Sequence, residues 1–200
     1  MRYWIIYLVI AFFLGVVLAI FEWPFWIAVV FLMAISFIFI GEMLYTIYIS
    51  QNSKRVAKFI KSKQKEPIYR YVYMQGHGSK EDQIEAIDAI LHKYKQPHIQ
   101  HYYRCLQFIL KERYELALEE ANQINKEPLM TYSNALVFAQ MGKETEALAY
   151  SFSKVWMQES ILASVARTKH DRISFERHAQ AAIDSSRGVQ RLSLIYAFNN

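Results

Sequence analysis

Two long apolar stretches at the start of the chain limit what it can fold into. Residues 3–21 carry no charged side chain, and none occurs between Glu22 and Glu42. A helix needs about 20 residues to cross about 30 Å of hydrocarbon, so each stretch is long enough to span a bilayer. Only residues 22–24 separate them, which leaves room for a tight reversal. The pattern predicts an antiparallel pair of membrane-spanning helices, over about 3–21 and 25–49.

A secretory signal peptide is the alternative interpretation of the first stretch. Its cleavage site needs small residues at the −3 and −1 positions. The stretch ends Ala19-Ile20-Phe21, and a phenylalanine is too large for the −1 position. Because apolar sequence also resumes directly afterwards, we expect both stretches to remain in the protein.

Basic residues predict how the hairpin is oriented. Arg2 precedes the first stretch, the turn between the stretches has no Lys or Arg, and residues 51–65 carry six cations and no acidic residue. The positive-inside rule therefore places both termini in the cytoplasm. The expected location is the cell membrane, which the chain crosses twice. The six cations also predict contact with anionic lipid headgroups, which is compatible with their role as topology signals. They are Lys54, Arg55, Lys58, Lys61, Lys63 and Lys65.

Glu42 needs a separate explanation, because a carboxylate at membrane depth is costly. In an antiparallel hairpin its depth is close to that of Arg2, so we expect an interfacial pair of Arg2 and Glu42. The alternative is a residue that couples to protons or ions. Such a residue needs polar neighbours in the membrane, and Ser36 and Thr46 are almost the only candidates.

Composition excludes several classes of function. Residues 66–200 carry 16 basic and 16 acidic side chains, so this part lacks the positive excess typical of nucleic-acid binders. The single cysteine, Cys105, excludes an internal disulfide framework and a cysteine-built zinc site. His98 and His101 have no obvious third metal ligand nearby. We therefore expect no nucleic acid, metal, cofactor or enzymatic activity.

The remainder of the chain is predicted to be all helical. Proline and glycine occur at joints, and amphipathic stretches of helix length lie between them. Ser79 followed by Asp82 is a start signal for a helix through Leu91. The expected organisation is a hairpin over 1–49, a basic juxtamembrane helix or linker over 50–66, and a helical domain over 67–200.

A self-similarity of about 30 residues runs through this helical part. Ala86, Ala117 and Ala147 recur in similar contexts, and Cys105-x-x-Phe108 is matched by Ala135-x-x-Phe138. The spacing predicts one helix pair per repeat, with a small residue where the two helices approach closely. A generic array of helical hairpins remains the alternative to any particular repeat family.

The stretch 101–128 resembles a tetratricopeptide repeat. It has the small residue Cys105, the aromatic Phe108, Tyr114 at the start of a second helix, Ala117 and the closing Pro128. Residues 131–154 look like a second repeat, and the last segment, 189–198, is expected to cap the array. The resemblance implies an all-α array whose first helices line a concave groove. By position, that groove would be lined by Tyr102, Leu106, Ile109, Tyr132, Leu136 and Ala139.

These features together suggest a function in binding. We expect a membrane-anchored adaptor or scaffold whose cytoplasmic repeat domain binds a protein partner. An accessory subunit of a membrane transporter or enzyme complex is the alternative, because Ala11, Gly15 and Ala19 form a seam that suits helix packing. A membrane enzyme with an unrecognised site is a further alternative.

Overall fold

The computed structural model describes residues 2–21, 24 and 26–199, and every regular element in these ranges is a helix. The predicted all-α class is therefore confirmed. The chain divides into two compact units, residues 1–45 and 46–200. The turn residues Glu22 and Trp23 lie outside the described residues.

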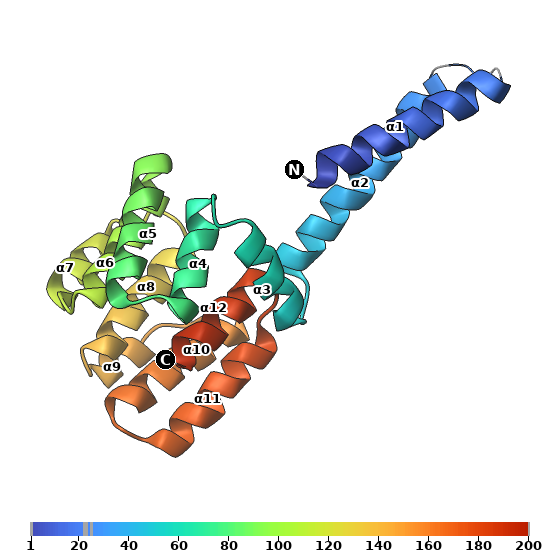
Figure 1. Cartoon of the computed structure of the whole chain (residues 1–200). Coiled ribbons are helices and arrows are strands. Elements are labelled where there is room, and N and C mark those ends of the chain that lie inside the picture. The colour runs from blue at the N-terminus through green and yellow to red at the C-terminus, as the bar shows by residue number, and fades with distance from the viewer. Residues whose placement is uncertain (1, 22–23, 25, 200) are drawn as a thin grey trace. The chain divides into compact units, whose positions relative to one another are not determined.

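The first unit consists of two long helices, α1 (Arg2–Phe21) and the greater part of α2 (Trp26–Tyr48), which run in opposite directions (Figure 1). Among the described residues, α2 is the one helix long and apolar enough to cross a bilayer. Most of its large apolar side chains are exposed, among them Phe37 at 67% and Ile38 at 66%. Such a helix near the N-terminus suits a single membrane anchor or a signal sequence. The two-span hairpin stays a prediction.

The second unit is a chain of shorter helices that pack in sequence (Figure 1). α4 pairs with α5, α6 with α7, α8 with α9 and α10 with α11, and α8 also contacts both α6 and α10. The helices are α3 (Ser53–Ser62), α4 (Pro67–His77), α5 (Lys80–Lys93), α6 (Pro97–Leu110), α7 (Tyr114–Asn122), α8 (Leu129–Gln140), α9 (Glu144–Leu148), α10 (Val155–Thr168), α11 (Arg172–Ser185) and α12 (Gly188–Phe198).

Three of the helix pairs share one turn geometry. Glu112, Gly142 and His170 each adopt a left-handed conformation, with φ of 57°, 73° and 59°. In each case the next amide donates to the carbonyl five residues earlier: Arg113 to Phe108, Lys143 to Phe138 and Asp171 to Ala166, all at 2.9 Å. This is the Schellman ending of a helix, which satisfies carbonyls that the helix leaves without partners.

Small residues lie where the paired helices meet. Cys105 is 1% exposed and Ala117 is fully buried, and both pack with Ala121 and Val137 in one apolar cluster. Ala147 is likewise fully buried between α8, α9 and α10. The predicted helix start at Ser79 is also confirmed, because Ser79 and Asp82 form a reciprocal capping box.

The C-terminal helix returns to the beginning of the unit. α12 packs against α3, α4 and α11, and Figure 1 shows it beside α4. Gly76 allows this approach, since a Cβ there would lie 2.5 Å from the ring of Tyr196. Gly188 begins α12 with φ +57°, and its amide donates to the Ser50 carbonyl at 2.8 Å. The first and last helices of the unit thus pack together.

Candidate functional site: a cavity closed by the C-terminal helix

The second unit contains a cavity of about 870 Å³. Volumes of about 300–1,000 Å³ are typical of sites that bind small molecules or short segments. One wall comes from α4 and α6 and is apolar and aromatic. A second group of lining residues, called the polar wall, comes from the start of α10, the α11–α12 turn and α12, and is mainly polar. Ile47 and Tyr48, in the last turn of α2, complete the lining.

Three tyrosines form the aromatic wall. The rings of Tyr71 and Tyr103 meet edge to face with centroids 5.8 Å apart, and those of Tyr102 and Tyr103 lie 5.1 Å apart. Tyr102 keeps part of its surface open but is otherwise enclosed by protein, and this burial raises its pKa well above the usual value. Burial also raises the pKa of Tyr71 and Tyr103. All three phenols are therefore neutral at physiological pH.

A short chain of hydrogen bonds links this wall to α12. Ser193 Oγ donates to Gln75 Oε1 at 2.7 Å, and Gln75 Nε2 donates to the Tyr71 hydroxyl oxygen at 3.3 Å. This chain of hydrogen bonds connects α4 with α12, two of the helices that line the cavity. It orients the Tyr71 ring, because a hydroxyl that accepts a fixed hydrogen bond loses rotational freedom.

The polar wall carries two cations. Lys154 directly precedes α10 and Arg187 directly precedes α12. Arg187 Nη1 donates to the carbonyls of Asp184 and Ser186, both at 2.8 Å, which holds the guanidinium at the turn. Within the described part of the chain, neither cation forms an ion pair with a carboxylate. The nearby Asp184 carboxylate pairs instead with Arg191, at 3.2 Å.

Of the six residues predicted for a groove, Tyr102 lines this cavity. Tyr132 is 8% exposed and donates or accepts a 2.9 Å hydrogen bond with Ser160 of α10, and Ala139 is fully buried in the same cluster. Leu136 packs against that cluster. The face of α8 that was expected to be open is thus occupied by α10.

The two remaining predicted positions on α6 pack against neighbouring helices. Leu106 lies half-buried against the cluster of α4 and α5 that contains Ile87. Ile109 lies half-buried against the cluster that contains Ala117. The structure thus separates the six residues between one cavity and three cores.

Sequence reasoning missed the cavity residues Tyr71, Tyr103, Lys154 and Arg187. The adjacent Tyr102-Tyr103 pair was a visible signal, since two bulky rings at the centre of a helix cannot both face one helix neighbour. No pattern within α10 or α12 indicated that the cations preceding these helices line the same cavity.

Two histidines bear on the predicted absence of metal chemistry. His101 Nδ1 lies 2.7 Å from Glu120 Oε2, which links α6 to α7, and His178 Nδ1 lies at the same distance from Glu159 Oε2 between α11 and α10. Among the described residues, no group of three or more His, Cys, Asp or Glu side chains is placed to hold a metal ion. These histidines tie the helices of a pair together.

Cys105 occupies a structural position. Its side chain is 1% exposed, and burial raises the pKa of the thiol to about 12. The thiol is therefore protonated at neutral pH, whereas a nucleophilic cysteine acts as the thiolate. It fills the small-residue position that the repeat pattern predicts.

A second candidate surface is the basic face of α3. Asn52 caps this helix by accepting the Arg55 amide at 3.1 Å, and Val56 and Ile60 are buried against α4 and α12. Burial of this apolar stripe turns the basic side chains outward. All six predicted membrane-surface cations are exposed: Lys54, Arg55, Lys58, Lys61, Lys63 and Lys65.

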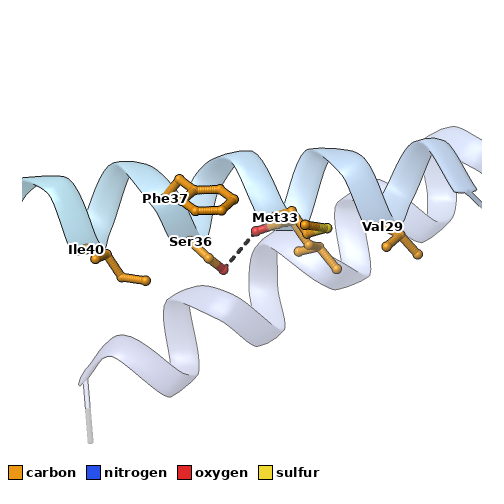
Figure 2. Close-up of a pocket in the computed structure, with 6 residues that line it drawn as sticks. Val29, Met33, Ser36, Phe37 and Ile40 are labelled. Carbon is orange, nitrogen blue, oxygen red and sulfur yellow. Dashed lines mark hydrogen bonds between the residues drawn. The ribbon is translucent and has the colours of Figure 1, made fainter.

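The apolar helix α2 carries a shallow groove. Figure 2 shows Val29, Met33, Ser36, Phe37 and Ile40 along it, and the one hydroxyl among them, that of Ser36, donates to the Leu32 carbonyl at 2.8 Å. Because this bond satisfies the hydroxyl within the helix, Ser36 is suited to a lipid environment. Glu42 is exposed, and the side chain of its predicted partner Arg2 lies outside the described residues.

Comparison of the chain with protein-family models, with curated protein sequences and with solved structures finds no match. The site is therefore interpreted from its geometry alone.

Proposed function

We propose that this protein is a membrane-anchored adaptor whose helical domain binds a segment of a protein partner in the cavity. The observation that carries this proposal is the cavity itself, with its wall of three enclosed tyrosines. Tyrosines supply large, rigid contact area with a polar tip, and such rings often dominate binding energy. A volume of about 870 Å³ suits a few side chains of a partner rather than a whole helix.

The anchor in this proposal is the two-span hairpin with a cytoplasmic C-terminus. The length of the apolar stretch preceding α2 and the basic residues that follow α2 support it. Anchoring raises the effective concentration of a bound partner at the membrane without any further contact. The adaptor role therefore needs only one binding site in the helical domain.

The domain in this proposal is tetratricopeptide-like. Sequential helix pairs, small residues at their contacts and the shared left-handed turns at Glu112, Gly142 and His170 support this assignment. It differs from an open array in one respect, because α12 joins the last pair to α4. Through Val189, Gln190 and Ser193, α12 also lines the cavity, whose size suits a short partner segment.

Site-specific photo-crosslinking tests the proposal. A photoreactive phenylalanine analogue replaces Tyr102 in the full-length protein in native membranes, and the matched control carries it at Ile173, which is 83% exposed on α11. We expect a discrete protein adduct at position 102 and none at 173. Absence of an adduct at 102, or the same adducts at both positions, would refute partner binding in the cavity.

The same method, with the photoreactive residue also placed at Met33, separates the adaptor from an accessory subunit of a membrane complex. The outward apolar face of α2, with its groove at Val29 and Met33, is the observation that favours the subunit. A soluble protein in the adduct supports the adaptor. An integral membrane protein crosslinked from Met33 supports the subunit.

A further inference from the structure

We propose that the cavity selects acidic segments, in which a carboxylate lies next to an aromatic or aliphatic side chain. This inference rests on the proposed function, since it names the chemistry of the partner segment that the cavity takes. The two walls of the cavity differ in chemistry, and the proposal follows from that difference.

The charge on the lining is positive. Lys154 and Arg187 both line the cavity, and no Asp or Glu among the described residues does. The Asp184 carboxylate on the same turn forms its ion pair with Arg191, at 3.2 Å, and attracts Arg187 only at longer range. Complementary charge across an interface selects partners and disfavours those of like charge. An acidic segment therefore fits this wall, and a basic one is repelled.

The geometry of Arg187 suits this role. Its Nη1 donates to the carbonyls of Asp184 and Ser186, and the Gln51 side-chain amide lies 2.7 Å from its Nη2. These partners are neutral, so they hold the guanidinium in place without cancelling its charge. A cation that is already oriented loses little side-chain entropy on binding. Lys154 and Arg187 also precede α10 and α12, where the helix dipoles add partial positive charge.

The hydroxyls of the polar wall favour a peptide over a lipid chain. Ser185 Oγ donates to Ala181 O and Ser193 Oγ donates to Gln75 Oε1, both at 2.7 Å. Their protons are used within the domain, so their oxygens are left to accept N–H groups. A peptide backbone supplies such donors, whereas an acyl chain would cover these oxygens without any hydrogen bond.

The aromatic wall completes the match. Tyr71, Tyr102 and Tyr103 line the same cavity as the two cations and contribute ring surface, with neutral phenols. An apolar side chain adjacent to the carboxylate can pack on these rings. The predicted ligand is thus amphipathic over two or three residues.

The test uses the full-length protein in nanodiscs and a displayed library of random 12-residue peptides as the probe. Four targets are compared: the wild type, Lys154→Glu with Arg187→Glu, Lys111→Glu with Lys126→Glu, and empty nanodiscs. Lys111 and Lys126 are exposed lysines outside the cavity, so the third target makes the same change in net charge. Thermal unfolding of each protein shows that the variants fold.

We expect the wild type and the Lys111/Lys126 variant to enrich Asp and Glu at least twofold over the starting library. The Lys154/Arg187 variant should lose this enrichment and bind the selected acidic peptides at least tenfold more weakly. A milder variant, Lys154→Gln with Arg187→Gln, should lie between the two if the glutamates disturb folding.

Three results would overturn the inference, and a fourth would count against the proposed function as well. Enriched peptides without acidic residues, or equal loss of binding in both charge-reversed variants, would refute acidic selection but leave partner binding intact. An anionic lipid that stays bound to the wild type and not to the Lys154/Arg187 variant in mass spectrometry, without acidic peptides, would assign the cavity to lipid. No enrichment above empty nanodiscs would count against the proposed function itself.

Discussion

At the scale of single residues, two glycines determine where the C-terminal helix packs. Gly76 leaves room for the Tyr196 ring, and Gly188 lets the start of α12 approach α2. A Cβ on Gly188 would lie 1.8 Å from the carbonyl oxygen of Ile47, a backbone atom that cannot move away as a flexible side chain can. Gly188 also has φ +57°, a conformation that other residues adopt only with strain. The start of α12 therefore needs glycine for two independent reasons.

This dual requirement predicts a graded effect of two substitutions. Gly142 has φ +73°, but a Cβ there would have no atom within 4 Å, so Gly142→Ala carries the conformational cost alone, about 1 kcal/mol. Gly188→Ala adds the overlap with Ile47 and should destabilise by roughly 1–3 kcal/mol more. Thermal unfolding of the second unit, residues 46–200, measures both. Equal melting temperatures for the two variants would contradict the close approach.

At the scale of elements, α3 shows how packing assigns a role to each face of a helix. Val56 and Ile60 are 1% and 0% exposed, so the apolar stripe of α3 is buried inside the domain. It is therefore not available to insert into a bilayer. Any attraction of α3 to a membrane is left to its exposed cations, which makes that attraction electrostatic and sensitive to salt.

Vesicle binding tests this property of α3. Replacing Lys54, Lys58, Lys61 and Lys63 with glutamine in a fragment of residues 46–200 should lower its affinity for phosphatidylglycerol vesicles by at least about 100-fold, since each cation near the surface contributes about 1 kcal/mol. Cosedimentation at low salt measures the affinity. The matched control replaces Lys95, Lys111, Lys126 and Lys143, which are exposed elsewhere on the domain. Equal loss in the control would show that only net charge matters.

The junction of α4 with α5 predicts a dependence on pH. Glu66, at the start of α4, accepts bonds from Lys93 Nζ at 2.8 and 2.7 Å and from the Tyr94 hydroxyl. The bond from Lys93, followed by that from Tyr94, lowers the pKa of the Glu66 carboxyl. Its charged form is thus favoured in the folded state. The stabilisation is fully present above the unfolded pKa, about 4.3, and is lost as the pH falls through the lower folded value.

A variant at this position checks the sign. Glu66→Gln should melt at a lower temperature than the wild type at pH 7, and the difference should shrink towards zero as the pH is lowered through the range where the wild-type carboxyl becomes protonated. Calorimetry from neutral to acidic pH measures the difference. Glu115→Gln, at an exposed position on α7, serves as the control and should show little change. A difference that persists unchanged at acidic pH would mean that the ionic form of Glu66 is not what stabilises the junction.

At the scale of the whole molecule, the arrangement of charge along the chain predicts topology. The basic residues after α2 imply a cytoplasmic second unit, and an apolar stretch on each side of residues 22–24 implies an external turn. Alkaline phosphatase, which is active only outside the membrane, should be silent when fused after Asn200. It should be active when fused after Pro24.

The pair of fusions distinguishes two spans from one. Activity at both positions would place the second unit outside and overturn the predicted orientation. If alkaline phosphatase is inactive at both positions although both fusion proteins are present in the cell, the first apolar stretch does not span the membrane. A green fluorescent protein fused after Asn200, which folds only in the cytoplasm, provides the complementary readout.

Much of this architecture follows from the sequence by itself, because it depends on local properties. These properties are set by neighbours within one or two helical turns or by spacing along the chain. They include the helix content, the apolar length of α2, the capping box at Ser79 and the small residues Cys105 and Ala117. Such features are visible as composition and period. The basic face of α3 belongs with them.

Only the tertiary structure decided which helix faces remain open. Tyr132 and Ala139 are buried because α10 packs on α8, and a repeat position cannot reveal which neighbour covers it. The cavity depends on contacts between α4 and α12, whose residues Gln75 and Ser193 are separated by 118 positions. Contacts between residues so far apart leave no periodic pattern in the sequence. They depend on the geometry of all the helix pairs that lie between α4 and α12. For that reason Lys154 and Arg187 look like ordinary surface cations in the sequence, whereas in the fold both line one cavity.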